Sequence, residues 1–150
     1  MARIRYTESM MNKKDTGFEE VSHTADLEIR VQAEDLESLF RGAANGMFYL
    51  CGVEDFEKAI SSVTQSISLE AMDYEGLLIL FLEELLYRLT EDYMYYKIGK
   101  ITIDSEYSLK AKLTGNQIKS YQRDIKAVTY HNLNIERTEQ GYAVNIVFDI

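Results

Sequence analysis

The sequence predicts an α+β fold, in which a single domain holds a mixed β-sheet packed against two main helices. Two observations lead to this prediction. Several short segments alternate apolar with polar residues, and two longer segments carry apolar residues at helical spacing. The chain has 150 residues, of which 46% are hydrophobic, so one domain can bury about two thirds of the surface of its unfolded chain.

The N-terminal residues 1–16 carry arginines and lysines but no apolar period. We therefore expect a mobile N-terminal arm, followed by a folded domain over residues 17–150. From Phe18 to Val31 apolar and polar residues alternate, which is typical of half-buried strand structure. Asp26 belongs to the polar row of this segment, so it should point away from the core.

Two helices are expected, one after Asp35 and one after Asp73, because aspartate is a favoured N-cap residue. Gly52 is placed to end the first helix. The second helix has the stronger pattern, and its wide apolar stripe indicates burial against a sheet, with a partner-binding groove as the alternative. The stripe consists of Leu77, Leu78, Phe81, Leu82, Leu85, Leu86 and Leu89.

Further alternating or apolar segments predict the remaining strands. These segments are residues 60–71, with Val63, Ile67 and Leu69 facing inward, and residues 98–103, 109–113, 125–130, 133–137 and 142–149. The last of them brings the chain to its end, with Asn145 and Asp149 on its polar row.

Composition restricts the partners. The formal net charge of -9 argues against a large phosphate-binding surface, so we expect no direct nucleic-acid binding and favour basic proteins or cations. No apolar segment approaches membrane-spanning length, and no secretory signal is recognisable, so we expect no membrane association. The single cysteine, Cys51, fits a buried thiol in a reducing cytoplasm.

Three anionic groups form a candidate site if the fold joins the two ends of the chain. They are the side chains of Asp26 and Asp149 and the α-carboxylate of Ile150. Calcium, magnesium and manganese prefer such oxygen donors, and three clustered anions would be unfavourable without a cation. The alternative for Asp26 is a solvated strand residue or an ion-pair partner of Arg30.

Two other residues are candidates for functional contacts, and no catalytic residue is predicted. His23, in the stretch His23-Thr24-Ala25-Asp26, has too few histidine and cysteine neighbours in the sequence for a zinc site, so we expect it to fix local geometry by hydrogen bonding. Lys126 is flanked by apolar residues and must direct its ammonium group to solvent or to an anion. A salt bridge is the default for Lys126, and a contact with a partner or a phosphate is the alternative.

Taken together, these segments resemble the archease family from about Phe18 to Ile150. The resemblance rests on five stretches in order, namely residues 23–26, 35–40, 81–87, 125–131 and 149–150. It implies that Asp26, Asp149 and Ile150 bind a divalent cation, with calcium favoured over magnesium or manganese, and that Lys126 takes part in function. Ser22 stands where the family is often acidic, which puts the strength of cation binding in doubt.

The resemblance also implies a role without catalysis of its own. Archease-like proteins act as protein cofactors of the RtcB-type RNA ligase, and they promote its guanylylation and multiple turnover in tRNA splicing and RNA repair. Two alternatives stay open. A metal-dependent RNA or nucleotide phosphohydrolase would need a second set of metal ligands that the sequence does not offer. A chaperone or scaffold for RNA-processing proteins would bind without the carboxylates.

Overall fold

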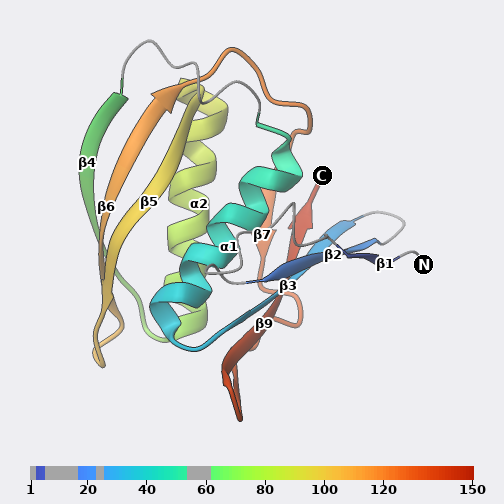
Figure 1. Ribbon diagram of the computed structural model, residues 1–150, viewed down its shortest axis with the longest axis vertical. Helices are drawn as coiled ribbons and strands as arrows, with labels where there is room; N and C mark the ends of the chain where they lie inside the picture. The colour runs from blue at the N-terminus through green and yellow to red at the C-terminus, as the bar shows by residue number, and fades with distance from the viewer. Residues whose placement is uncertain (1–2, 6–16, 23–25, 54–61) are drawn as a thin grey trace. The chain divides into compact units, whose positions relative to one another are not determined.

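The computed structural model shows an α+β protein in which the described residues form two helices and nine strands (Figure 1). The described residues are 3–5, 17–22, 26–53 and 62–150. The chain divides into two compact units, the first made of residues 1–46 and 125–150 and the second of residues 47–124. The predicted α+β class and the two main helices are confirmed. The strands form two sheets where one was expected, and every described strand pair is antiparallel.

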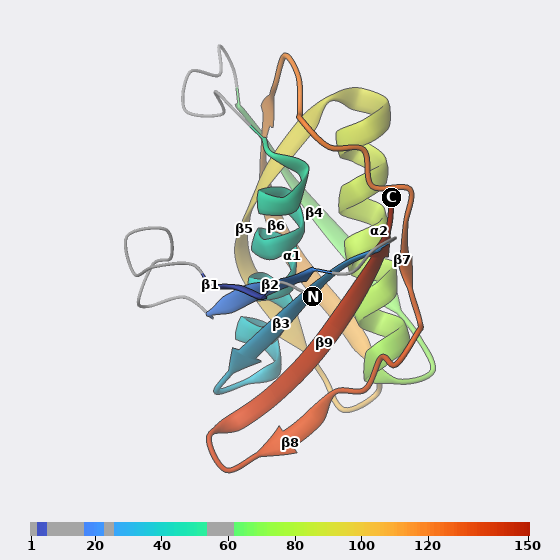
Figure 2. The same cartoon turned by 90° about the vertical axis from the view of Figure 1, so that its right-hand side faces the viewer.

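The first unit contains a six-stranded sheet in the order β1-β2-β3-β9-β7, with β8 also paired to β9. Its strands are β1 (Arg3–Arg5), β2 (Phe18–Ser22), β3 (Asp26–Ala33), β7 (Ala127–Thr129), β8 (Glu136–Thr138) and β9 (Gly141–Asp149). Figure 2 shows β9 running between β3 and β7. The last strand of the chain is therefore an interior strand, hydrogen-bonded along both edges.

Two features of this sheet differ from the sequence-based expectation. The alternating segment that begins at Phe18 is divided into the two paired strands β2 and β3, because a period of two continues through a hairpin and does not reveal the turn. Part of the expected N-terminal arm is regular structure, since β1 pairs with β2. The rest of the arm lies outside the described residues.

Helix α1 (Leu36–Cys51) begins in the first unit and continues into the second after Gly46. The carboxylate of Asp35 accepts a hydrogen bond of 2.7 Å from the backbone N–H three residues later, which confirms the predicted N-cap. Gly52, with φ of 66°, follows the helix in the left-handed conformation. A Cβ atom on Gly46 would lie 2.7 Å from Cδ1 of Ile29, so close packing of α1 on β3 accounts for a glycine inside the helix.

The second unit contains a three-stranded sheet in the order β4-β6-β5 and helix α2 (Tyr74–Asp92), which packs against it. The strands are β4 (Ser62–Glu70), β5 (Met94–Ile103) and β6 (Ser108–Gln117). The apolar stripe of α2 is buried, as predicted for a helix that covers a sheet. Val63 is an exception to the expected inward row of β4. It is 46% exposed, because it lies near the start of an edge strand that has a neighbour on one side only.

Arg88 connects α2 to two strands of this sheet. Its Nη1 donates to Oε1 of Gln65 on β4, and its Cζ lies 5.4 Å from the ring centroid of Tyr96 on β5. Its Nε donates to Oε1 of Glu84, one helical turn away, at 2.9 Å. The planar guanidinium group makes these contacts through two of its nitrogen atoms and its flat face, a geometry that the compact ammonium group of lysine does not reproduce.

Cys51 is a free, buried cysteine, as predicted. Burial, together with the negative charge of Asp124, raises the pKa of its thiol from the ordinary 9.0 to about 12. The thiol is therefore protonated and unreactive at neutral pH. Neither described helix is long and apolar enough to cross a membrane.

Candidate metal centre

The candidate centre lies at the end of β9, where three strands of the first unit meet. Asp149 is the last residue of β9, and it pairs with Asp26 of β3 on one side and with Ala127 of β7 on the other. The backbone N–H of Lys126 donates to the carbonyl oxygen of Asp149 at 2.8 Å. The fold therefore brings together residues from both ends of the chain and from the segment before β7.

The register brings the two aspartate side chains close together. Directly opposite residues of an antiparallel pair point to the same face, with Cβ atoms about 4.5–5.5 Å apart. Asp26 and Asp149 are opposite each other, and Ile150, which carries the terminal carboxylate, follows directly. Asp26 is half-buried and Asp149 is exposed, while Ile150 is 46% exposed. This end of the sheet is thus open to solvent and rich in negative charge.

The donor set fits a hard divalent cation. Carboxylate oxygens are the ligands that calcium, magnesium and manganese prefer, and a cation would offset the repulsion between opposed aspartates. No cluster of three histidine, cysteine, aspartate or glutamate side chains occurs among the described residues. The described side chains therefore supply the aspartate pair without a third His, Cys, Asp or Glu, and the terminal carboxylate of Ile150 is the next anionic group along the chain. Cation binding itself stays a prediction.

The neighbouring residues on this face clarify the role of Asp26. Arg30, the ion-pair partner considered from the sequence, donates instead from Nη1 to Oδ1 of Asn145 at 2.9 Å. Arg30 and Asn145 are themselves opposite residues of β3 and β9. The arginine thus has a partner of its own four residues along the strand, which leaves the carboxylate pair to be balanced by other means.

The remaining predicted residues are placed differently. The side chain of Lys126 is exposed, and its backbone is the part that contacts Asp149. Sequence patterns missed this backbone contact, because only the pairing of β7 with β9 creates it. His23 lies outside the described residues, so its role in local geometry stays a prediction.

A separate hollow lies near the start of β9. It has a volume of about 480 Å³ and is lined by the segment that enters α1 and by the turn between β8 and β9, including Asp35, Arg137 and Tyr142. Arg137 lies over the ring of Tyr142, with its Cζ 5.4 Å from the ring centroid. This contact holds the arginine within the β8–β9 hairpin, at the opposite end of β9 from Asp149.

Fold and site together define a class, namely small α+β proteins with a carboxylate pair at the end of an interior C-terminal strand. A model of the archease protein family matches residues 18–150. A protein archease of Methanosarcina mazei is 33% identical over 141 residues, covering 89% of this chain and 95% of that protein. A protein archease of Saccharolobus islandicus is 37% identical over 138 residues, covering 89% of this chain and 98% of that protein. The chain belongs to the archease family.

Two solved structures agree with this assignment. The solution structure of protein 1598 of Methanobacterium thermoautotrophicum has a TM-score of 0.67 and 26% identity, and the match covers 89% of this chain and 98% of that one. The crystal structure of a Thermotoga maritima protein, described as an archease and possible chaperone, has a TM-score of 0.64 and 21% identity. The match covers 87% of this chain and 94% of that one. The second likeness supports the fold alone.

Proposed function

We propose that this chain is a cytoplasmic protein cofactor that binds a divalent cation and activates an RtcB-type RNA ligase, promoting guanylylation and multiple turnover in tRNA splicing and RNA repair. Membership of the archease family supports the proposal. The observation that carries the cation part is the register of β3 with β9, in which Asp26 is opposite Asp149 beside the chain end.

In this proposal the residues around the end of β9 have separate roles. Asp26, Asp149 and the terminal carboxylate of Ile150 would hold the cation, with calcium favoured over magnesium or manganese. The cation would supply positive charge that a phosphate or a carboxylate of the ligase complex can contact. Lys126 offers an exposed ammonium group beside the same strand end. The net charge of -9 favours encounter with a basic surface of the ligase.

A turnover assay tests the proposal. Ligase at catalytic concentration is mixed with RNA carrying 2′,3′-cyclic phosphate and 5′-hydroxyl ends, with GTP and manganese, and the joined product is counted per ligase molecule. The parent protein should allow many turnovers, and Asp26→Ala and Asp149→Ala should allow few. The matched control is Glu136→Ala, an exposed carboxylate on β8. Equal assistance by all variants would show that the carboxylate pair is not the working part.

A chaperone for RNA-processing proteins is the second candidate, because the related Thermotoga maritima structure is described as a possible chaperone. This function predicts suppression of client aggregation that persists in chelator and in Asp149→Ala. A metal-dependent phosphohydrolase, the third alternative, predicts a cleaved RNA or nucleotide product from this protein alone. Each outcome differs from ligase activation, which needs the ligase and the carboxylates together.

A further inference from the structure

The three-stranded sheet of the second unit carries a positive charge that the total charge of the chain conceals. Strands β4, β5 and β6 contain four lysines and a single carboxylate, Glu70, which is the last residue of β4. The chain as a whole has a net charge of -9. Four of the 16 basic residues are therefore on these strands with one carboxylate beside them, on a sheet other than the one that holds the candidate metal centre.

The alternation of β6 places its lysines on one face of the sheet. Leu109, Ala111 and Leu113 are buried, while Lys110 and Lys112 between them are exposed. Since α2 packs against this sheet and residues at every second position share a face, the two lysines lie on the face away from α2. We call this face the outer face.

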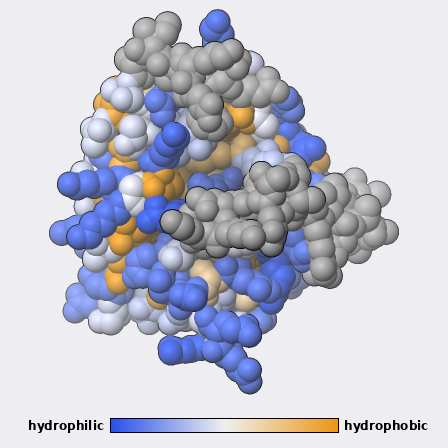
Figure 3. Space-filling view, in the orientation of Figure 1, coloured by the Kyte–Doolittle hydropathy of each residue, from blue (hydrophilic) through white to orange (hydrophobic). Residues whose placement is uncertain are grey.

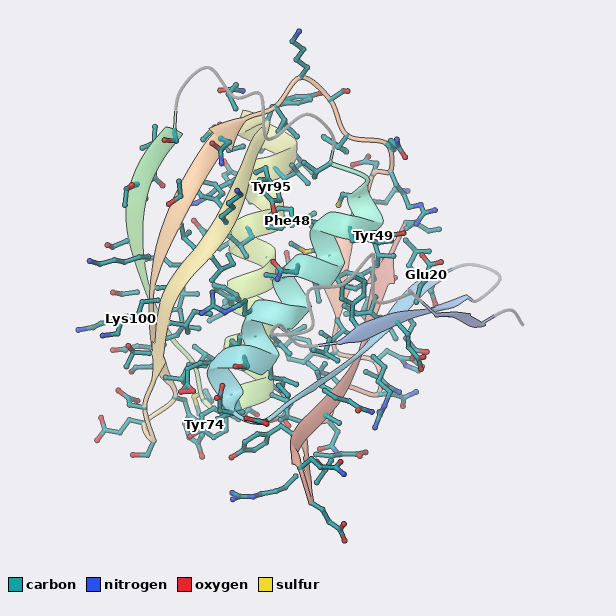
Figure 4. The ribbon with its side chains drawn as sticks, viewed as in Figure 1. Glu20, Phe48, Tyr49, Tyr74, Tyr95 and Lys100 are labelled. Carbon is teal, nitrogen blue, oxygen red and sulfur yellow. The ribbon has the colours of Figure 1, made fainter. Side chains whose placement is uncertain are left out.

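Strand β5 adds two further lysines. Lys97 is opposite Thr114 of β6, and it is exposed. The register shifts between Ile98 and Ile101, so Lys100 lies in a bulge. Figure 4 shows Lys100 projecting from the sheet on the side away from α2.

The bulge places Lys100 beside the lysines of β6. A Cβ atom on Gly99 would be 2.9 Å from the carbonyl oxygen of Lys112, so the bulged segment of β5 lies against the Lys112 backbone. Three lysines are thus grouped on neighbouring strands. In Figure 3, hydrophilic side chains project along the left side of the molecule, where Figure 1 draws this sheet.

Hydroxyl groups fill the space around the lysines. Ser66 is opposite Lys112, and Lys110 is opposite both Ser68 and Thr102. The exposed residues of the outer face are lysines 97, 100, 110 and 112 with Ser62, Thr64, Ser66, Ser68, Thr102 and Glu70. Apart from Glu70, which is the last residue of β4, this set offers hydrogen-bond donors of the kind that contact phosphate oxygens.

Five carboxylates of this unit lie on the helix that covers the other face of the sheet. Within α2 they are Glu75, Glu83, Glu84, Glu91 and Asp92. Asp104, in the turn between β5 and β6, accepts backbone hydrogen bonds from Glu106 at 2.9 Å and Ser108 at 3.1 Å. The unit is therefore basic on the outer face of its sheet and acidic on its helix. The net charge of the chain reports neither of these local charges.

We propose that the outer face of β4-β6-β5 binds the phosphate backbone of RNA. Lys110 and Lys112 are two residues apart on a strand, which separates their Cα atoms by about 6.8 Å, and adjacent strands are about 4.8 Å apart. The result is a shallow array of ammonium and hydroxyl groups. Its exposed set contains no aromatic side chain for base stacking, so RNA is bound through phosphates, without sequence preference.

RNA suits this face better than an acidic protein does. Protein interfaces bury an apolar centre surrounded by a polar rim, and the exposed set of the outer face offers no large apolar side chain. Phosphate contacts need only cations and hydrogen-bond donors. The net charge of -9 predicts no direct nucleic-acid binding only if the charge is spread evenly over the surface, and on this sheet it is not.

Fluorescence anisotropy with the full chain and a labelled oligouridylate of about 20 nucleotides tests the proposal in low salt, about 50 mM. Contacts from the three grouped lysines, Lys100, Lys110 and Lys112, predict that log K falls with log salt with a slope of about -2.1. The double variant Lys110→Gln/Lys112→Gln should bind on the order of tenfold more weakly, with a slope smaller by about 1.4. Oligoadenylate of the same length should bind as the oligouridylate does.

The matched control is Lys119→Glu, which changes the net charge by the same amount at an exposed position beyond the end of β6. It should retain most of the parent affinity. Absence of RNA binding in low salt overturns the proposal, as does an equal loss in the control and the double variant. Tighter binding of polyglutamate than of RNA also overturns it, in favour of an acidic protein. Because no ligase and no divalent cation are present, the result is independent of the proposed function.

Discussion

Replacing Asp26 with asparagine should change the stability of the protein in opposite directions with and without a divalent cation. Asp26 is directly opposite Asp149 in the pairing of β3 with β9. Like charges at such positions destabilise an antiparallel pair by about 0.2–1 kcal/mol. In chelator, Asp26→Asn removes this repulsion, so the melting temperature should rise by up to about 4 °C.

A bound cation reverses the order. A cation at about 100 times its dissociation constant stabilises the parent protein by about 2.7 kcal/mol. For a chain of 150 residues, this corresponds to an increase of about 5–11 °C in melting temperature. Asp26→Asn lacks one of the proposed ligands and should gain little, so it should become the less stable protein.

Thermal unfolding followed by circular dichroism, in chelator and over a calcium titration, measures both effects. The control is Glu136→Gln, which removes one exposed carboxylate from β8 and should follow the parent in both conditions. The reasoning would be refuted by a variant that melts below the parent in chelator, or by a variant that calcium stabilises as much as it stabilises the parent. The same titration with magnesium and manganese ranks the cations.

Three further predictions concern other parts of the chain. A Gly-Ser extension after Ile150 moves the terminal carboxylate. It should weaken calcium binding by at least tenfold, on the order expected for loss of a ligand. Unchanged affinity in calorimetry would exclude that carboxylate as a calcium ligand. Arg88→Ala removes the guanidinium that contacts two strands. It should lower the free energy of unfolding by about 2 kcal/mol, or the melting temperature by about 4–8 °C, as followed by circular dichroism. Arg88→Lys should lose part of this stability. Because the pKa of Cys51 is raised from 9.0 to about 12, the unfolded chain releases this proton first as pH rises. The unfolding free energy of the parent should therefore fall, relative to that of Cys51→Ala, by about 1.4 kcal/mol per pH unit above pH 9, and parallel pH profiles would contradict the shift.

The helices were predictable because their signals are local. Asp35 and Asp73 cap the helices as their positions in the sequence suggest, and the apolar stripe of α2 is buried. The partners of the strands were not predictable, because a period of two indicates a face and not a neighbour. The sequence placed Asp149 on a polar row, but only the pairing of β9 with β3 brings Asp26 opposite it.

The basic face of the second unit was also not predictable from the sequence. The segment from Leu109 to Leu113 predicts a strand with alternating lysines, which is a common pattern for a solvated face. Whether these lysines form a basic face depends on the bulge that brings Lys100 beside Lys112. It also depends on β4, which supplies hydroxyl groups and no lysine. Net charge is an average over the chain, so it cannot report a charged face.

The position of β9 supports the proposal that the terminal carboxylate is a cation ligand. Terminal residues usually fray, so a terminal carboxylate is a poor ligand unless the backbone before it is held in place. Here Phe148 is fully buried and lies opposite both Leu27 and Val128, and the carbonyl of Asp149 accepts the hydrogen bond from Lys126. Core packing at Phe148 therefore holds the backbone directly before the proposed ligands. We expect Phe148→Ala to weaken calcium binding in calorimetry as well as to lower the melting temperature, and unchanged affinity would show that this packing does not position the carboxylates.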